Sequence, residues 1–395
     1  WGNVKIEYYI FKMRGNGMSA KILTKSMKII DMFSTSISIA NREIGLNTEP
    51  YVIAELSGNH KGSLEKALAM IDSAAATGVD AIKIQTYSAD TITLNHDAPE
   101  FKIEGGLWAG RTLYDLYQEA HTPWNWHKAL FERARKRNIT LFSSPFDLTA
   151  IELLESLDCP AYKIASFEIN DLGLIAAAVK TNKPIIMSTG LATLEEIYEA
   201  VSTVAESGGT QLALLHCISG YPTPIEDCNL RTVADLCNRF DFPIGLSDHT
   251  IDSTASTTAI ALGASVIEKH FTLDKNDGSV DAAFSLEPEA FRQLKLDTTR
   301  VHKALGAVGY EIKPSEAGGR DFRRSLYVTR AIKKGECFTK ENVRSVRPAL
   351  GLHTRYLEQV IGQQASQNIA FGEPMSECFL TKPLITVPLI KPSVK

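Results

Sequence analysis

The hexapeptide VIEKHF, residues 266–271, places two apolar residues directly before three ionisable ones. Its first two residues are typical of the buried end of a β-strand, whereas Glu268, Lys269 and His270 carry charge or can take up a proton. A charged group that is buried without a partner is costly in free energy. We therefore expect this strand to end in a polar environment that uses its ionisable side chains.

Similar short apolar runs occur at seven earlier places in the chain. They are YVIAEL (51–56), AIKIQT (81–86), TLFSSP (140–145), AYKIAS (161–166), PIIMST (184–189), LALLHC (212–217) and PIGLSD (243–248), and the last run is SVIEKH (265–270). Between most of them lie segments with the apolar spacing of helices, which are expected to close at Gly78, Asn138, Asn182 and Gly208. Strands that alternate with helices indicate parallel βα units, and eight such units can close a barrel.

The fold class predicted from this pattern is α/β, a (β/α)8 TIM barrel followed by a small C-terminal domain. An open doubly wound sheet is the alternative, but it would normally carry a glycine-rich nucleotide-binding turn, and none is present. The expected segments are an N-terminal extension that is partly disordered (1–49), the barrel (50–305), a linker (306–320), the small domain (321–380) and a tail (381–395). Within the extension, the natural start is expected at Met27.

Composition excludes several classes of partner. The net charge of the 395-residue chain is −4, which gives no electrostatic reason to expect nucleic acid or an anionic membrane. No apolar run is long enough to predict a transmembrane helix. The six cysteines are scattered without a CxxC pair, which is typical of a reducing compartment. We therefore expect a cytoplasmic protein that binds small molecules.

Polar side chains mark the C-terminal end of every expected strand. They are Glu55; Lys83 and Gln85; Ser143 and Ser144; Lys163 and Ser166; Ser188 and Thr189; His216 and Ser219; Ser247, Asp248 and His249; and Glu268, Lys269 and His270. All parallel strands of a barrel direct their C-terminal ends to one face, where the active sites of such enzymes lie. These groups are therefore expected to surround a single site.

His249 and His270 follow adjacent expected strands. Two imidazoles, a carboxylate and open water positions suit a catalytic Mn²⁺, Mg²⁺ or Co²⁺ ion. The alternative is that one histidine only orients a neighbouring side chain. No Cys/His spacing supports a closed zinc site.

A second set of strand-end residues indicates an anion site. It consists of Lys83, Lys163, Ser166, Ser188 and Ser247. Ammonium and hydroxyl groups at one face suit a phosphate. Two alternatives stay open, a Schiff-base aldolase that uses one desolvated lysine, and a lysine in a buried ion pair with Glu55 or Glu268. The loop of about 50 residues after AIKIQT is expected to form a lid or substrate wall.

Seven segments together resemble the sialic acid synthase family, whose members condense phosphoenolpyruvate with an acylamino sugar. They are IAELSGNHKGSLEKA, AIKIQTY, FSSPFD, PAYKIASFE, STGLATLEE, GLSDHT and VIEKHFTL, in this order. The resemblance covers residues 50–380 and implies that residues 321–380 form an antifreeze-like (SAF, β-clip) domain. LWAGRTLYDLYQEAHTPWNWH and DAAFSLEP most resemble the branch that makes pseudaminic acid, whose acceptor is 2,4-diacetamido-2,4,6-trideoxy-L-altrose. Neuraminate and legionaminate synthases are the alternative branches.

The resemblance implies a role for particular residues. His249 and His270 match the family's metal ligands, and Glu55 matches a carboxylate near the metal and the reacting carbons. The residues expected to bind the substrates in the barrel are Lys83, Gln85, Lys163, Ser166, Ser188, Ser219, Tyr221 and Ser247. Ser219 stands where neuraminate synthases carry Asn, which is consistent with a different acceptor. Phe322 and Arg347 match residues that cover the sugar from the partner subunit of a domain-swapped homodimer.

The expected reaction is a condensation followed by hydrolysis. The metal would act as a Lewis acid on the aldehyde oxygen, while the lysines and serines hold phosphoenolpyruvate so that its C3 faces the aldehyde. Glu55 would favour the positive charge that develops at C2, where water then adds and phosphate leaves. Either Glu55 or a metal-bound water would handle the protons. An alternative of another class is a non-catalytic carbohydrate-binding protein.

Overall fold

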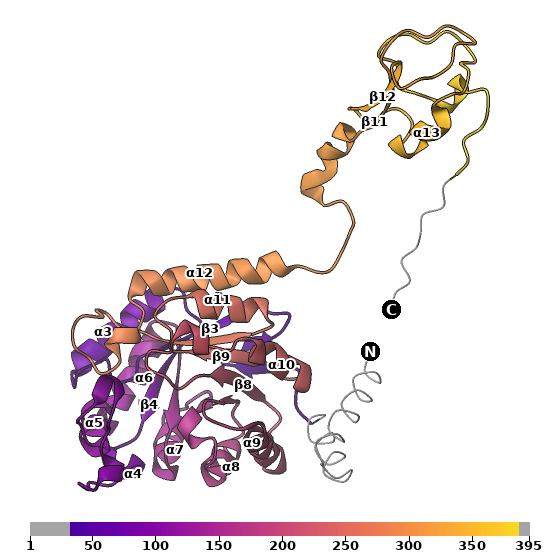
Figure 1. The fold of residues 1–395 in the computed structure, drawn as a ribbon. Coiled ribbons are helices and arrows are strands. Elements are labelled where there is room, and N and C mark those ends of the chain that lie inside the picture. Colours follow the sequence, from indigo (N-terminus) through magenta and orange to yellow (C-terminus); the bar gives the residue numbers. More distant parts are fainter. Residues whose placement is uncertain (1–31, 387–395) are drawn as a thin grey trace. The chain divides into compact units, whose positions relative to one another are not determined.

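All eight expected strands are present in the computed structural model, where they close into a parallel barrel (Figure 1). In their order around the barrel they are β3 (Tyr51–Glu55), β4 (Ala81–Thr86), β5 (Thr140–Pro145), β6 (Tyr162–Ile164), β7 (Ile185–Ser188), β8 (Leu212–Cys217), β9 (Ile244–Asp248) and β10 (Val266–His270), which pairs with β3. This arrangement confirms the predicted TIM barrel. The structure describes residues 32–386.

Helices cover the outside of the barrel (Figure 1). They are α3 (Leu64–Ala76), α6 (His127–Lys136), α7 (Leu148–Glu155), α8 (Leu172–Val179), α9 (Leu194–Glu206), α10 (Arg231–Arg239), α11 (Thr254–Ala261) and α12 (Pro288–Leu305). Four of them begin at a side chain that accepts a free backbone N–H, namely Ser63, Asp147, Asp171 and Thr193. A positive φ, which glycine and asparagine tolerate best, is found at all four predicted closing residues, Gly78, Asn138, Asn182 and Gly208.

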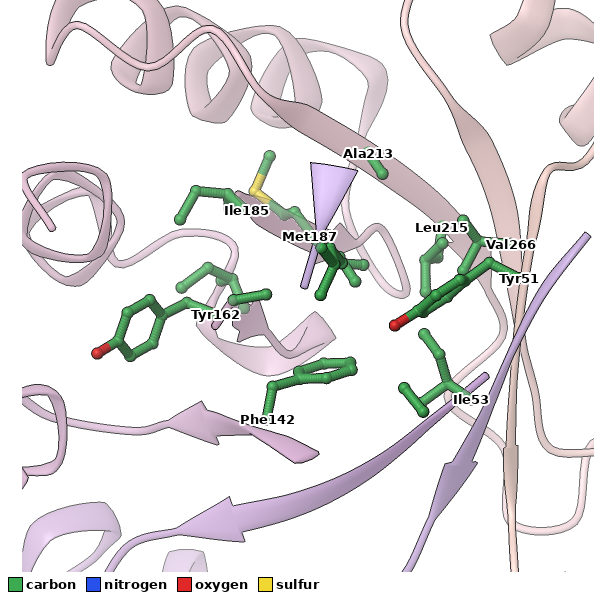
Figure 2. Close-up of a cluster of buried hydrophobic side chains, with 14 of the residues drawn as sticks. Tyr51, Ile53, Phe142, Tyr162, Ile185, Met187, Ala213, Leu215 and Val266 are labelled. Carbon is green, nitrogen blue, oxygen red and sulfur yellow. The ribbon is translucent and has the colours of Figure 1, made fainter. Parts of the chain in front are cut away.

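Apolar side chains fill the lower interior of the barrel. Ile53, Phe142, Leu215 and Val266 are all 0% exposed and belong to one core cluster, and Figure 2 shows them close together. Side chains that are two residues apart on a strand point to the same face of the sheet. The next inward-facing residues are therefore polar or reactive, namely Glu55, Ser144, Cys217 and Glu268. The apolar layer thus closes the barrel beneath a layer of chemical groups.

A hairpin precedes the barrel and corrects the expected boundary of the N-terminal extension. Strands β1 (Ser36–Ile39) and β2 (Arg42–Gly45) pair antiparallel, and Ile37, Ile39 and Ile44 are at most 1% exposed and join the barrel core. The part of the range 1–49 from Phe33 onward therefore belongs to the barrel unit. The two strands, SISI and REIG, contain no continuous apolar run of the kind that marks the barrel strands, so the sequence pattern did not reveal them. The expected start at Met27 lies outside the described residues.

The long connection between β4 and β5 is folded into short helices. These are α4 (Ala89–Ile92), η1 (Pro99–Phe101), η2 (Gly106–Trp108), α5 (Leu113–Ala120) and η3 (Trp124–Trp126). The indole Nε1 of Trp108 donates a hydrogen bond of 3.0 Å to the carbonyl of Val280, which follows β10. Shorter helical turns in other loops at this end are η4 (Ser166–Glu168), η5 (Ile225–Asp227) and η6 (Ala282–Phe284). The connection is thus tied to the loop after the last barrel strand.

Residues 307–395 form a second unit. Its described elements are η7 (Pro314–Phe322), β11 (Ser325–Val328), β12 (Val343–Val346), η8 (Thr354–Tyr356), α13 (Leu357–Val360) and η9 (Glu377–Phe379). Leu326, Ile332 and Phe338 are buried in a core of its own. The last residues of the expected tail, 387–395, lie outside the described residues. Among the helices of residues 32–386, none combines the length and apolar character needed to cross a membrane.

Candidate active site

A cavity of about 480 Å³ opens at the C-terminal ends of the barrel strands. The predicted site residues that line it are Lys83, Gln85, Lys163, Ser166, Ser188, Tyr221, Ser247, His249 and His270. They come from strands β4, β6, β7, β9 and β10 and from the loops that follow β6, β8 and β9. The structure therefore brings together residues that are nearly 190 positions apart in the sequence.

Two lysines and two glutamates form a buried ionic cluster in this cavity. Lys83 Nζ lies 3.0 Å from Glu268 Oε1 and 3.3 Å from Glu55 Oε2, whereas Lys163 Nζ lies 3.7 Å from Glu268 Oε1. Lys163 is 1% exposed, and its ammonium also donates a long hydrogen bond of 3.4 Å to the carbonyl of Ile164. Lys83 thus has two carboxylate partners, while the charge of Lys163 is poorly neutralised. An anionic ligand beside Lys163 would neutralise the rest of its charge.

Burial sets the protonation of the cluster. Burial raises the pKa of Glu55 to about 7, although Lys83 lowers it in part. Burial lowers the pKa of Lys163 to about 8. Burial also opposes the charge of Glu268, but Lys163 and Lys83 outweigh it and hold the pKa of Glu268 below its usual range. Glu55 can therefore hold or release a proton near neutral pH, while Glu268 stays charged.

Serine hydroxyls line the same cavity as the two lysines. Ser247 Oγ donates to Glu268 Oε1 at 3.1 Å, and Ser166 Oγ accepts from the backbone N–H of Gly190 at 3.0 Å. A Cβ at Gly190 would lie 2.7 Å from Ser166 Oγ and 2.4 Å from Ser219 Oγ, so glycine keeps space for both hydroxyls. Ser188 Oγ is buried and makes no hydrogen bond. A buried hydroxyl without a partner at a cavity wall indicates a place for a ligand.

The two predicted metal ligands lie side by side. The ring centroids of His249 and His270 are 5.3 Å apart. His249 Nδ1 lies 3.0 Å from the carbonyl of Ile218, which can only accept, so Nδ1 carries a proton and Nε2 is the nitrogen left for a metal. Burial opposes the charge of His249, but Cys217 and the Ile218 carbonyl outweigh it and raise the pKa of this imidazole. Burial lowers the pKa of His270 well below its usual value, so this imidazole is neutral. His270 therefore has a lone pair to offer, and His249 has one at Nε2 in its neutral form.

A carboxylate stands beside the second histidine. His270 Nδ1 is buried without a hydrogen bond and lies 3.7 Å from Asp281 Oδ2. Asp281 is itself buried and accepts a hydrogen bond from Ser57 Oγ. Within the described residues, no group of three or more His, Cys, Asp or Glu side chains is placed so that it could hold a metal ion. The donors present are thus two imidazoles with a carboxylate nearby, and a metal would need further ligands from water or substrate.

An apolar wall faces the charged floor. It consists of Ile92, Ile103, Trp108, Leu113, Leu116, Tyr117 and Ala120 from the β4–β5 connection, together with Tyr87 and Phe146. Tyr87 packs edge-on against Phe146 at 5.0 Å and Tyr117 at 5.8 Å, and Trp108 lies 5.6 Å from Tyr221. The connection after β4 therefore forms one wall of the cavity, at the segment that the sequence predicts to be a lid or substrate wall. The cavity suits a ligand that is anionic at one end and carries methyl groups at the other.

Four predicted site residues do not line the cavity. Glu55 lies behind it and accepts a hydrogen bond of 2.9 Å from Gln85 Nε2. Ser219 lies in the loop after β8, with its Oγ 3.9 Å from Cys217 Sγ. Phe322 and Arg347 belong to the second unit, where both are exposed. The structure therefore places the first two next to the lining residues and leaves the roles of the other two as predictions.

The sequence reasoning missed two acidic residues that line the cavity, Glu168 and Asp281. Glu168 Oε2 is buried without a hydrogen bond, and burial raises the pKa of Glu168 to about 7. Both residues lie in loops beyond a strand end, so a search restricted to strand ends passes over them. Glu168 follows Ser166 by two residues in AYKIASFE, and Asp281 opens DAAFSLEP. A search that ran three or four residues past each strand would have found Glu168.

The fold and the cavity together define a class of protein. Active sites of TIM-barrel enzymes lie at the C-terminal ends of the strands. Here that position combines one poorly neutralised ammonium group, two imidazoles and two carboxyl groups with raised pKa values. Perturbed ionisable groups that converge in one cavity are typical of catalysis. The chain is an α/β-barrel enzyme with a site for an anionic substrate.

The chain belongs to the NeuB family, whose sequence profile matches residues 70–310, and a SAF domain profile matches residues 323–377. A pseudaminic acid synthase of Campylobacter jejuni is 46% identical over 327 residues, which are 83% of this chain and 95% of that protein. The pseudaminic acid synthase of Helicobacter pylori is 44% identical over 328 residues, 83% of this chain and 96% of that protein. The predicted family and the predicted SAF domain are thereby confirmed.

A solved structure is similar over most of its length. It is the N-acetylneuraminic acid (sialic acid) synthetase from Leptospira borgpetersenii serovar Hardjo-bovis, crystallised in complex with citrate. Its TM-score against this chain is 0.65 at 34% sequence identity, covering 72% of this chain and 94% of that one.

Proposed function

We propose that this chain is a pseudaminic acid synthase. It condenses phosphoenolpyruvate with 2,4-diacetamido-2,4,6-trideoxy-L-altrose and water, and it releases pseudaminic acid and phosphate. The observation that carries the proposal is the cavity, where a poorly neutralised ammonium and an unpartnered hydroxyl face an apolar wall. The identity with pseudaminic acid synthases over nearly their whole length supports the choice of product.

Phosphoenolpyruvate fits the charged floor. Its phosphate and carboxylate are both anionic. Lys163 Nζ lies 3.7 Å from its carboxylate partner Glu268, so this ammonium is only weakly paired and can bind an anion. The hydroxyl of Ser188 has no other partner. Charge-assisted hydrogen bonds of this kind are shorter and stronger than neutral ones. Holding both reactants in place would remove up to about 7–11 kcal/mol of the barrier in favourable cases.

The bond changes balance with these groups. The C2=C3 double bond of phosphoenolpyruvate opens as C3 forms a bond to the aldehyde carbon of the open-chain sugar, and the aldehyde C=O double bond opens as its oxygen takes up a proton and becomes a hydroxyl. The oxygen of water then bonds to the electron-poor C2 and loses both of its protons as the C2–O bond to phosphate breaks, which leaves a ketone and inorganic phosphate. These two protons replace the one taken up by the aldehyde oxygen and supply one to the departing phosphate. Glu55 would hold or release a proton in these steps, because it lies next to the lining residues Lys83 and Gln85 and its pKa of about 7 lets it exist in either form.

A divalent metal ion fits the remaining donors. His249 and His270 would hold it, because each can turn a ring nitrogen to the metal in its neutral form and Asp281 lies beside His270. Hard divalent ions that accept nitrogen and oxygen ligands, such as Mn²⁺, Mg²⁺ or Co²⁺, suit such a set. When bound, the ion would polarise the aldehyde as a Lewis acid.

The acceptor's methyl groups fit the apolar wall. The trideoxy sugar carries a methyl at C6 and two acetamido methyls, whereas N-acetylmannosamine has a hydroxyl at C6. We expect kcat/KM for the altrose to exceed that for N-acetylmannosamine by about 100-fold, the limit for an apolar pocket facing an added hydroxyl. Phosphate release and product mass, measured with both sugars and the legionaminate precursor, check this. A preference for N-acetylmannosamine would make the chain a neuraminate synthase, and a preference for the legionaminate precursor would make it a legionaminate synthase. Equal rates with all three sugars would contradict the role given to the apolar wall.

One observation favours a second candidate function, a Schiff-base aldolase. The lowered pKa of Lys163, about 8, leaves part of its amine neutral and nucleophilic near neutral pH. Borohydride added during turnover distinguishes the two. The synthase predicts no covalent adduct on Lys163 and one phosphate per product, whereas the aldolase predicts a trapped adduct. A third outcome would exclude both functions. In it, the protein binds the sugar but leaves it unchanged, and the rate of phosphate release is the same with and without sugar.

We also propose that the site is completed by a second copy of the chain. Large apolar side chains are exposed in five successive loops at the cavity end of the barrel. This apolar rim consists of Leu148, Phe167, Leu191, Ile225 and Ile251, which are 57%, 58%, 73%, 49% and 67% exposed. Exposed apolar patches often mark interfaces. The proposed cover is the partner's second unit, in which Phe322 is 66% exposed.

Subunit mixing tests this arrangement. Arg347→Ala and His249→Ala are each expected to inactivate a homodimer, because one removes the covering arginine and the other a metal ligand. Mixed at equal amounts, they should recover up to roughly a quarter of wild-type activity, since half of the dimers are mixed and each has one intact site. Phosphate release after refolding the mixture measures the recovery. A mixture as inactive as its parents would show that Arg347 does not act across subunits.

The proposed location is the cytoplasm. All six cysteines are free, and three of them are buried in the barrel unit. Free thiols persist in reducing compartments.

A further inference from the structure

We propose that the buried ion pair between Asp248 and Lys269 positions the two metal-binding histidines. The inference rests on the proposed metal site and goes beyond it, because neither residue lines the cavity. Lys269 Nζ lies 3.0 Å from Asp248 Oδ2, and the two residues are 0% and 3% exposed. The pair therefore acts through the histidines that follow it in the chain.

The register of the barrel places the pair directly behind the histidines. Asp248 and Lys269 are paired across strands β9 and β10, and the next residues in the chain are His249, which directly follows β9, and His270, which ends β10. Consecutive residues of a strand point to opposite faces. The ion pair accordingly faces away from the cavity, while both imidazoles line it. A link between the strands at this position fixes the separation of the two rings.

The pair also closes the turn after β9. Asp248 Oδ1 accepts hydrogen bonds of 2.8 Å from both the backbone N–H and the hydroxyl of Thr250, and Oδ2 accepts one of 2.5 Å from Ser256 Oγ. Lys269 Nζ donates a hydrogen bond of 2.6 Å to the carbonyl of Thr250. His249 thus lies between two residues that the same network holds. The segment 249–253 has no regular secondary structure, so these contacts define its path.

A purely structural role would not require charge at this place. Replacing a buried ion pair by apolar groups of similar volume is often neutral or stabilising. What such a replacement loses is the directed hydrogen bonding that fixes geometry. Partners behind metal ligands typically contribute 10- to 100-fold to metal affinity. Loss of the ion pair should therefore weaken metal binding without lowering the stability of the fold.

The test compares Mn²⁺ binding with stability. The double variant Asp248→Asn/Lys269→Met removes both charges and nearly keeps the volume, and Asp248→Asn alone keeps an acceptor for Thr250. We expect the Kd for Mn²⁺, measured by electron paramagnetic resonance, to rise about 10- to 100-fold in the double variant and less in the single one. The midpoint of thermal unfolding should stay near the wild-type value, and KM for phosphoenolpyruvate should not change, because the lysines of the cavity are untouched.

A matched control is available at the other end of the barrel. Lys295 Nζ pairs with Asp80 Oδ2 at 2.5 Å, and Asp80 directly precedes β4. Lys295→Met should leave Mn²⁺ affinity unchanged. A folded double variant that binds Mn²⁺ as tightly as the wild type would overturn the inference. If the wild type binds no Mn²⁺ the inference falls with the metal site, whereas the synthase proposal itself falls only if the wild type also releases no phosphate.

Discussion

Replacing Lys83 with methionine is expected to lower both activity and stability. Its ammonium holds Glu55 and Glu268 at 3.3 Å and 3.0 Å, and Lys83 is 3% exposed. Removing one partner of a buried ion pair typically costs about 3–5 kcal/mol, because the remaining charge is left uncompensated. Removing a group that stabilises developing charge typically costs about 10²–10³-fold in kcat. Urea unfolding and phosphate release from phosphoenolpyruvate measure the two effects.

Lys163→Met is the matched comparison, and its effect on stability has the opposite sign. Burial lowers the pKa of Lys163 to about 8, below the unfolded value of 10.5. Protonated Lys163 therefore opposes folding below about pH 8, and this cost disappears as pH rises toward 10.5. At pH 7 the variant should be at least as stable as the wild type, yet its KM for phosphoenolpyruvate should rise. Equal destabilisation by the two substitutions would contradict this description of the cluster.

Removing divalent metal is expected to stop the reaction. A Lewis acid contributes several kcal/mol to such a step, so chelation should lower activity by about 10²–10⁴-fold. EDTA followed by added Mn²⁺ should abolish and then restore phosphate release. His270→Ala should be as inactive as the chelated enzyme and should not respond to Mn²⁺, because the second imidazole is gone.

Two results would refute the metal proposal. One is wild-type activity that persists after EDTA treatment and gel filtration. The other is His270→Ala that retains Mn²⁺-dependent turnover. The control is Lys295→Met at the opposite end of the barrel, which touches no cavity residue and should respond to EDTA and Mn²⁺ as the wild type does.

Strand ends were predictable because two rules act together in this fold. Apolar runs of six residues reveal the strands, and parallel strands direct their C-terminal ends to one face. Lys83, Lys163, His249 and His270 could therefore be placed in one site from the sequence. The same rules explain why Glu55 was found, although it lies behind Gln85 rather than at the cavity surface.

Contacts that depend on loop paths were beyond these rules. Glu168 and Asp281 enter the cavity from loops, and the direction of a loop is set by tertiary contacts such as the hydrogen bond from Trp108 to Val280. The hairpin of β1 and β2 was missed because its strands, SISI and REIG, lack the continuous apolar run that reveals the barrel strands. The sequence could not decide whether Glu55 or Glu268 pairs with a buried lysine. In the structure Lys83 contacts both, and the two distances differ by only a few tenths of an ångström.

Anomalous X-ray diffraction from crystals grown with Mn²⁺ and phosphoenolpyruvate tests the central claim most directly. The predicted result is a single manganese peak between the imidazoles of His249 and His270, with the enol phosphate bound to Lys83 and Lys163 in the same cavity. Manganese bound away from the two histidines, or an enol phosphate that contacts neither lysine, would contradict the account.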